Sequence, residues 1–424
     1  MNYLDLVLAA QKRGEGRGIA SICSAHPWVL GSIMQQAAGT GTVLLVESTC
    51  NQVNQFGGYT SMRPIDFVNF VQGIAVENEL PPKQLILGGD HLGPHVWQAE
   101  PGESAMQKAV EMVRAYVQAG YSKIHLDASM KLGDDDPSRP LDIDLTAKRT
   151  TQLAIAAEAV ADPNPERKPR YVIGTEVPLP GGATEHEGHV SITKVEDVQK
   201  MLDVTHAAFK DAGLGATWER VIAVVVQPGV EFGDDFVLDY NPDNAKKLSL
   251  FSASTPFVYE AHSTDYQTRD NLRNLVRDHF AILKVGPALT FAFREAIFAL
   301  AKIENELFPL DERSNLIEVL DDVMVHQPEH WQKYYSGTPR EQAFKRKYSL
   351  SDRARYYWPN QVVQAALDKL LANLNANPLP LSLISQYVPG AYADIRAGCL
   401  PNSASNIVFH HIQSVFKEYL LASG

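Results

Sequence analysis

Short apolar runs and longer amphipathic segments alternate along the chain from residue 18 to residue 286. The runs are rich in β-branched residues, which is typical of strands. They predict strands over residues 18–25, 42–49, 84–91, 123–129, 170–177, 220–227, 256–263 and 281–286. The segments between them place apolar residues at helical spacing and predict helices over residues 64–76, 105–119, 145–160, 195–212 and 268–278.

The regular alternation of strand and helix indicates βα units around a parallel sheet. Each link between runs is long enough for a crossover connection. Residues 221–226 are apolar without alternation, as expected for a strand buried on both faces. Eight such units predict an α/β fold of the (β/α)8 or TIM barrel type. An open doubly wound sheet is the alternative.

The pattern changes after the eighth run. Residues 288–307 predict one long helix, and helical segments without comparable strand signals follow it. We therefore predict a barrel over residues 1–308 and a helical C-terminal extension over residues 309–424 that packs on the barrel. Aromatic clusters at 331–335 and 353–359 are expected to pack helices onto a neighbouring surface. The extension is also the surface expected to contact a partner or a second copy of the chain.

Composition narrows the class of partner. The 424 residues are 45% apolar and 21% charged, so the chain can bury a large core. The net charge of −12 argues against nucleic acid or an anionic membrane surface as a partner, because both would repel the chain.

The three cysteines indicate the compartment. Cys23, Cys50 and Cys399 lie far apart, match no zinc spacing and suggest a reducing compartment. The sequence shows no membrane-spanning run and no secretory signal pattern, so we expect a cytoplasmic protein.

Polar residues follow nearly every predicted strand. In a (β/α)8 barrel the carboxyl ends of all strands open on one rim, so these residues converge although they are distant in sequence. Buried charges need partners, and a cluster of acids, histidines and amides is suited to a divalent metal and a polyhydroxylated ligand. For any single Asp or His, a satisfied strand-end hydrogen bond is an equally good explanation. The collective pattern is the stronger signal.

These strand ends supply the candidate site residues. The predicted metal ligands are His91, Glu231 and His262. They suit zinc, manganese or magnesium and would leave coordination positions open for substrate oxygens. The residues predicted to move protons or to support the ligands are Asp90, Asp127 and Glu176. The residues expected to bind substrate are Glu47, Gln227, Ser263, Asp265, Lys284 and Gly286.

Glycine-rich segments give no nucleotide-binding motif. Residues 14–18 precede a predicted strand, whereas a dinucleotide-binding loop follows one. The sequence contains no Walker-type phosphate loop. We therefore expect no nucleotide cofactor.

Several long strings of residues resemble one known family, the Z-type subunits of class II tagatose-1,6-bisphosphate aldolase. The strings that carry the resemblance most specifically are residues 47–59, 88–94 and 259–267. The likeness continues through residues 173–178, 226–232, 283–291 and 348–353. It therefore covers nearly the whole chain.

The resemblance implies a role in galactitol, N-acetylgalactosamine or tagatose catabolism. In that family a separate Y-type subunit cleaves tagatose 1,6-bisphosphate to glycerone phosphate and glyceraldehyde 3-phosphate. The Z-type subunit is regarded as non-catalytic and as supporting the activity and stability of the Y-type subunit. Similar chains have also been labelled tagatose-6-phosphate kinase, a label that the absent nucleotide motif does not favour.

The zinc-dependent class II aldolases are a more distant likeness. Asp90 and His91 resemble their base and first ligand, and His262 resembles their last histidine ligand. Lys284 to Gly286 is similar to their Lys-Val-Asn segment. Their middle histidine has no counterpart here, because the stretch after Val226 offers Gln227 and Glu231 instead. A carboxylate in that place adds negative charge and makes the metal a weaker electrophile.

Three functions follow from these patterns. The first is an accessory subunit that binds a Y-type catalytic subunit and a sugar phosphate. The second is an autonomous metal-dependent aldolase or epimerase acting on a ketohexose or its phosphate, in which Asp90 or Glu176 moves the proton. The third is a tagatose-6-phosphate kinase, which requires ATP binding. The resemblance places the accessory subunit first.

Overall fold

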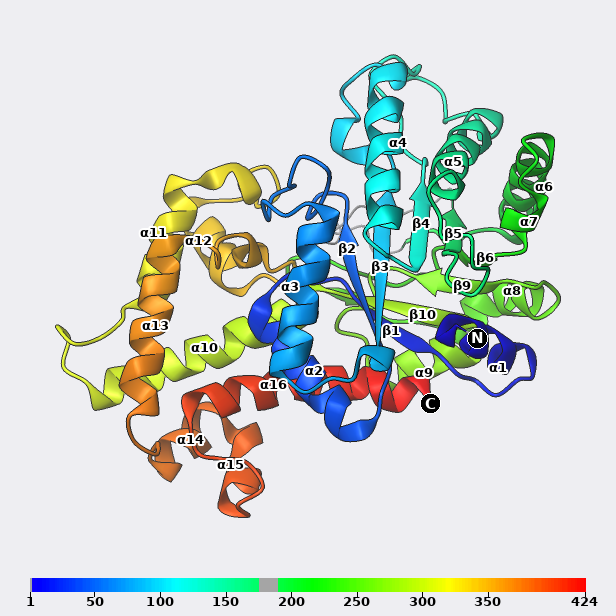
Figure 1. Cartoon of the computed structure of the whole chain (residues 1–424). Helices are drawn as coiled ribbons and strands as arrows, with labels where there is room; N and C mark the ends of the chain where they lie inside the picture. Colours follow the sequence, from blue (N-terminus) through cyan, green and yellow to red (C-terminus); the bar gives the residue numbers. More distant parts are fainter. Residues whose placement is uncertain (1, 175–189) are drawn as a thin grey trace.

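Residues 2–174 and 190–424, which the computed structural model describes, are built around a closed barrel of eight parallel strands (Figure 1). The strands are β1 (Ile19–Ile22), β2 (Leu44–Thr49), β3 (Leu85–Leu92), β4 (Lys123–Asp127), β5 (Arg170–Gly174), β6 (Val221–Val225), β9 (Val258–Ala261) and β10 (Phe280–Val285). They follow this order around the barrel, and β10 pairs with β1. Each strand overlaps one predicted run, which confirms the TIM barrel and excludes the open sheet.

Helices separate the strands and cover the outside of the barrel. They are α2 (Pro27–Thr40), α3 (Pro64–Glu77), α4 (Gly102–Gln118), α5 (Ile143–Glu158), α6 (Val195–Asp211), the short α7 (Gly215–Trp218), α8 (Pro242–Ala253) and α9 (Arg269–Arg277). The five helices predicted between strands agree with α3, α4, α5, α6 and α9 to within three residues. Proline begins α2, α3 and α8, where its fixed φ suits the first helical position. None of the described helices is long and apolar enough to cross a membrane.

Helix α1 (Tyr3–Lys12) closes the end of the barrel where the strands begin. Leu4 and Val7 of α1 pack on an apolar layer of the barrel interior. That layer includes Ile19, Leu45, Ile86, Val172, Val258 and Ile282. An ion pair of 2.6 Å between Asp5 and Arg170 fixes α1 to the start of β5. The opposite end, where the strands finish, is left open for a site.

The chain leaves the barrel through α10 (Pro287–Leu307) and forms a helical region beside it. The helices of this region are α11 (Leu316–His326), α12 (Pro339–Tyr348), α13 (Gln361–Asn375), α14 (Leu381–Tyr387) and α15 (Pro389–Arg396). Its aromatic clusters are largely buried, with Trp331, Tyr335, Tyr357 and Trp358 all inside. The predicted packing role of these aromatics is confirmed.

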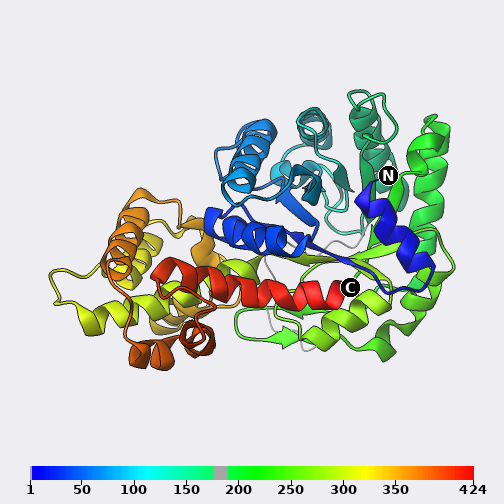
Figure 2. The same ribbon diagram turned by 60° about the horizontal axis from the view of Figure 1, so that its bottom comes forward.

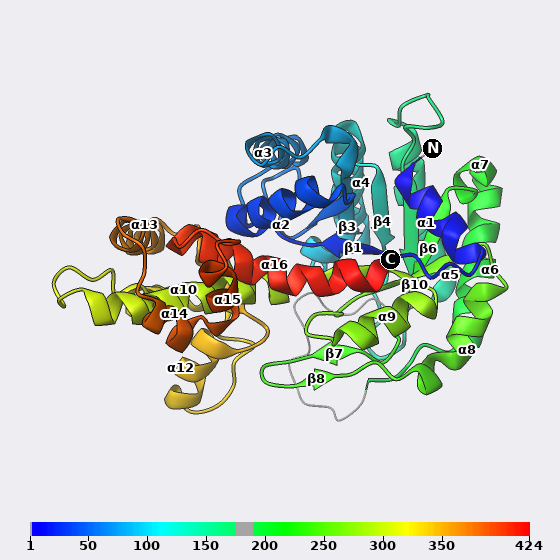
Figure 3. The ribbon, with the colours of Figure 1, turned by 90° about the horizontal axis from the view of Figure 1, so that it is seen from below.

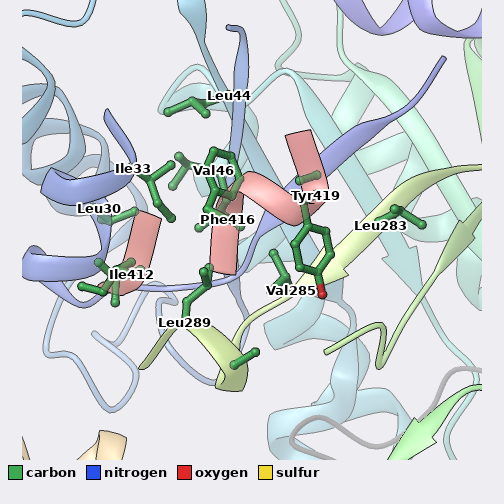
Figure 4. Close-up of a cluster of buried hydrophobic side chains, with 14 of the residues drawn as sticks. Leu30, Ile33, Leu44, Val46, Leu283, Val285, Leu289, Ile412, Phe416 and Tyr419 are labelled. Atoms are coloured by element: carbon green, nitrogen blue, oxygen red, sulfur yellow. The ribbon is translucent and has the colours of Figure 1, made fainter. Parts of the chain in front are cut away.

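Helix α16 (Ala404–Ser423) then returns to the barrel, and Figures 2 and 3 show it running back beside α2. Figure 4 shows its side chains Ile412, Phe416 and Tyr419 among apolar residues of the barrel. The barrel residues labelled there are Leu30, Ile33, Leu44, Val46, Leu283, Val285 and Leu289. The Tyr419 hydroxyl also donates to the Thr264 carbonyl at 2.8 Å. This helix is therefore anchored in the barrel by both packing and hydrogen bonding.

The position of α16 is that of a barrel helix. It contacts α2, α9, α10 and β1. In a regular (β/α)8 barrel, the gap between these elements is filled by the helix that follows the last strand. Here α10 occupies only part of that gap because it continues outward to α11 and α13. Part of the predicted extension thus completes the barrel, and the domain boundary at residue 308 stays a prediction.

A short antiparallel hairpin follows β6, made of β7 (Glu231–Phe232) and β8 (Val237–Leu238), and is visible in Figure 3. The sequence pattern did not predict it. Its turn residue Asp234 pairs with Lys345 at 2.9 Å and accepts a hydrogen bond from the Ser349 hydroxyl at 3.0 Å. The hairpin therefore joins the barrel rim to the segment that follows α12.

Candidate metal centre

The barrel interior changes from apolar to charged toward the carboxyl ends of the strands. Alternate residues of a strand point the same way, so Glu47 lies above Leu45 in β2 and Lys284 lies above Ile282 in β10. Lys123 and Glu260 are also among the fully buried charged residues of the barrel strands. Buried charges are stable only when they are paired.

Two lysines pair the acids of this layer. Lys123 Nζ lies 2.6 Å from Glu47 Oε1 and 2.6 Å from Glu260 Oε2. Lys284 forms an ion pair with the other oxygen of Glu47 and lies 3.4 Å from Glu260 Oε1. Lys284 Nζ also lies 2.9 Å from Asp90 Oδ1, so this lysine connects the layer to the end of β3.

Gly88 provides the space for the Glu47 carboxylate. The strands β2 and β3 pair in register, which sets Glu47 directly beside Gly88. A Cβ atom at Gly88 would lie 2.4 Å from Glu47 Oε1, closer than any non-bonded contact permits. The first glycine of the Gly-Gly-Asp-His string therefore has a packing function inside the barrel.

Three histidines and two aspartates lie above the lysines. His125 Nδ1 is 2.9 Å from Asp90 Oδ1, and His91 Nδ1 is 2.9 Å from Asp127 Oδ2. The rings of His91, His125 and His262 are mutual neighbours, with centroids 4.9–5.5 Å apart. His91 has a left-handed backbone with φ of 50°, which is unusual for a non-glycine residue and is held here by the surrounding contacts.

Four of these side chains form a group that could hold a metal ion. Asp90, His125, Glu260 and His262 each offer a ligand atom, and these atoms all lie within 4.8 Å of one another. His262 Nε2 is 3.0 Å from Glu260 Oε1. Among the described residues His125 Nε2 is buried without a hydrogen-bond partner, so this nitrogen is free to coordinate an ion. Imidazole and carboxylate together suit zinc or manganese.

The charges of the centre also fit a divalent cation. Burial alone would raise the pKa of Asp90 and Glu260, but cationic neighbours outweigh it and hold both well below their usual range. Those neighbours are His91 and Lys284 for Asp90, and Lys123 and Lys284 for Glu260. Burial lowers the pKa of His262 to about 4, so this imidazole is neutral at pH 7 and can donate a lone pair.

We expect the chain to bind one equivalent of manganese or zinc. His262→Asn should weaken that binding at least about 100-fold, because losing a direct ligand lowers metal affinity no less than losing a residue that is hydrogen-bonded to a ligand. Titration calorimetry on chelator-treated protein measures the affinity. His411→Asn, on the exposed face of α16, is the matched control and should bind as the unchanged chain does. Equal metal affinity in both variants would rule out this ligand set.

The predicted site residues divide between this centre and its surroundings. Asp90 and His262 belong to the donor group, and His91 and Asp127 are hydrogen-bonded to each other beside it. Glu231 lies on the β7–β8 hairpin, where Oε1 accepts from the backbone N–H of Phe232 at 3.0 Å. In the described residues the donor atoms that converge are those of Asp90, His125, Glu260 and His262. The predicted triad of His91, Glu231 and His262 shares only His262 with this group.

A cavity of about 550 Å³ opens above the centre. Of the residues expected to bind substrate, those that line it are Ser263, Asp265, Lys284 and Gly286. Asp265 Oδ1 accepts from the backbone N–H groups of Gly286 at 3.0 Å and Ala288 at 2.8 Å, which fixes the start of α10. Burial raises the pKa of Asp265 to about 6.

The other two residues expected to bind substrate have different contacts. Both Glu47 oxygens face lysines beneath the cavity. Gln227 Oε1 accepts from the backbone N–H groups of Gly229 and Val230 and stabilises the turn before β7. Glu176 lies outside the described residues. Neither Glu47 nor Gln227 is among the described residues that line the cavity.

Sequence reasoning missed His125 and Glu260 as candidate ligands and Lys123 as the cation that pairs with Glu260. A signal existed in β4, where Lys123, His125 and Asp127 alternate with the apolar Ile124 and Leu126. Polar residues at alternate positions of a strand inside a barrel share one face, which here is the interior. The contribution of the helical region to the cavity was also missed.

The sequence is similar to proteins described as subunits of an aldolase. The sequence model of the family described as D-tagatose-1,6-bisphosphate aldolase subunit GatZ/KbaZ-like matches residues 4–424. The chain is 51% identical over 413 residues to the D-tagatose-1,6-bisphosphate aldolase subunit GatZ of Salmonella dublin, covering 97% of both chains. The subunit GatZ of Salmonella typhimurium is similar to the same extent.

A solved structure is similar over nearly its full length. It is a probable tagatose 6 phosphate kinase from Sinorhizobium meliloti 1021, with a TM-score of 0.88 and 44% sequence identity. The match covers 96% of this chain and 100% of that one. The barrel with its helical region is therefore shared by both proteins.

Proposed function

The chain belongs to the GatZ/KbaZ-like family of D-tagatose-1,6-bisphosphate aldolase subunits, and we propose that it supports the activity and stability of a separate catalytic subunit of that aldolase. The observation that carries this proposal is the 51% identity over 97% of the chain to subunits of that name. The corresponding role is in galactitol, N-acetylgalactosamine or tagatose catabolism.

The composition of the metal centre supports a non-catalytic role. In this proposal Asp90, His125, Glu260 and His262 hold a divalent metal, and the cavity above them receives a sugar phosphate. Two carboxylates among four ligands lower the positive charge that a metal presents to a substrate oxygen. When bound, the metal would orient substrate oxygens more effectively than it would stabilise an enediolate.

The second candidate is an autonomous metal-dependent aldolase or epimerase. It is favoured by one specific observation, that the donor group is complete and opens on a cavity of about 550 Å³, within the usual size range of small-molecule sites. In this case Asp127 would move the proton, because Asp90 belongs to the donor group. His91 lies beside both acids and would orient the substrate.

The two candidates separate in a cleavage assay with tagatose 1,6-bisphosphate. We expect no measurable cleavage by this chain alone with added zinc or manganese, and increased activity and thermal stability of a Y-type subunit when this chain is added. Coupled detection of glyceraldehyde 3-phosphate gives the rate. ATP consumption with tagatose 6-phosphate, measured in parallel, tests for kinase activity.

Chelator-sensitive cleavage by the chain alone, lost in His262→Asn, would replace the supporting role with the enzymatic one. A Y-type subunit that gains neither activity nor stability would also reject the supporting role. His411→Asn again serves as the control, because the partly exposed His411 side chain lies on α16 and pairs with Glu295 of α10.

A further inference from the structure

The helical region beside the barrel supplies part of the cavity wall. Residues Arg355, Tyr356 and Trp358 follow α12 and line the same cavity as Asp90 and His262. They belong to the aromatic cluster that the sequence pattern assigned to packing. Trp358 does pack, edge to face on Phe293 of α10 with centroids 4.9 Å apart.

The backbone that carries Arg355 is firmly held. The buried Asp352 carboxylate accepts from Thr290 Oγ1 at 2.6 Å and from Arg294 Nε at 2.9 Å, both on α10. Tyr335 Oη lies 3.1 Å from Ser351 Oγ. Arg355 is therefore fixed to α10. Asp265 caps the first turn of this helix at the rim of the metal centre.

Arg355 is a cation without a direct ion pair among the described residues, although Asp352 and Asp265 are close enough to interact with its charge. Its Nη1 donates to the carbonyls of Ser351 and Asp352, and its Nη2 donates to Tyr356 Oη at 2.9 Å. The two carbonyls are uncharged, and the cationic Arg355 and Arg353 lower the pKa of the Tyr356 hydroxyl. Within residues 2–174 and 190–424 Arg355 forms no ion pair with a carboxylate. A guanidinium has five N–H donors, so Nε and one N–H of Nη2 remain available.

The other cation of the cavity is already neutralised. Lys284 is the second lysine or arginine among the described lining residues, and it pairs with Glu47, Asp90 and Glu260. An anionic part of a ligand would be repelled by the acids around Lys284 and attracted to Arg355. Tyr59 and Tyr356, in edge-to-face contact with centroids 5.0 Å apart, form the adjoining wall.

We propose that Arg355, presented by the helical region, recognises the phosphate of a sugar phosphate whose hydroxyl groups reach toward the metal centre. The inference rests on the proposed function for the ligand class and adds the residue that selects it. Arginine binds phosphate through paired N–H donors and stays charged at all physiological pH values. The helical region is then part of the ligand site.

Binding calorimetry with the metal-loaded chain alone tests this inference. We expect Arg355→Met to weaken D-tagatose 6-phosphate binding by about 10- to 100-fold, the loss typical of a charge-assisted hydrogen-bonded pair. Binding of unphosphorylated D-tagatose should not change. Arg340→Met, an exposed arginine of α12, is the control and should bind both sugars normally.

Arg355→Lys keeps the positive charge but loses the paired N–H donors. Its affinity for D-tagatose 6-phosphate should therefore lie between that of the unchanged chain and that of Arg355→Met. This variant provides the test if Arg355→Met does not fold. Unchanged affinity of a folded Arg355 variant for D-tagatose 6-phosphate, or equal losses for both sugars, would overturn the inference. The assay contains no Y-type subunit. The unchanged chain could fail to support the aldolase while the Arg355→Met variant still loses phosphate recognition. That result would confirm this inference and reject the proposed function.

Discussion

A chain that ends at residue 403 is expected to be insoluble or unfolded, although it retains all eight strands of the barrel. Removing α16 uncovers the apolar side chains of α2, β2, β10 and α10 that Figure 4 shows around Phe416. Circular dichroism and thermal unfolding of the truncated chain measure the effect. A soluble chain with a cooperative unfolding transition would show that α16 is dispensable for the barrel.

A single substitution tests the same contact more finely. Phe416→Ala should lower the free energy of unfolding by about 3–5 kcal/mol, because it leaves a cavity in a closely packed core. Leu421→Ala, on an exposed position of α16, should change it by no more than about 0.5 kcal/mol. Urea unfolding of both variants gives the comparison. Similar values for the two would mean that α16 contributes little through packing.

Lys123→Met is expected to lower the free energy of unfolding by about 3–5 kcal/mol, which is the cost of leaving buried charges without their partner. Lys123 is fully buried and is the cation that bridges Glu47 and Glu260. Urea unfolding measures the loss. Lys247→Met, an exposed lysine on α8, should leave stability nearly unchanged.

A double variant separates charge from packing. Adding Glu260→Gln to Lys123→Met removes one of the two buried carboxylates that have lost Lys123 as a partner, so part of the lost stability should return. The comparison is between the losses of stability that Glu260→Gln causes with and without Lys123→Met. Equal losses would show that the two residues do not interact and that the ion pair has no energetic role.

The sequence predicted the barrel because each strand is a buried, β-branched run that repeats at regular spacing. It could not show where α16 lies, since an apolar helix face indicates burial without naming its partner. The pattern also did not predict the hairpin that carries Glu231, because β7 and β8 are each only two residues long.

The candidate site was predicted in part for a related reason. Asp90, His91 and His262 stand in the last two positions of the predicted runs 84–91 and 256–263, and the ends of such runs are expected on the rim. His125 and Glu260 lie within strands, and their inward orientation depends on the register of each strand in the closed barrel. Arg355 reaches the cavity through the packing of a distant helical region, which local patterns do not encode.

The place of α16 also determines when the barrel can be completed during synthesis. The strand that it covers, β1, begins at Ile19, whereas α16 begins at Ala404. A ribosome adds roughly 5–20 residues per second, so the groove beside α2 stays uncovered for many seconds while the intervening chain is made. Leu30 and Ile33 remain open to chaperones during that interval. In refolding, likewise, this part of the core is complete only once α16 has docked against α2.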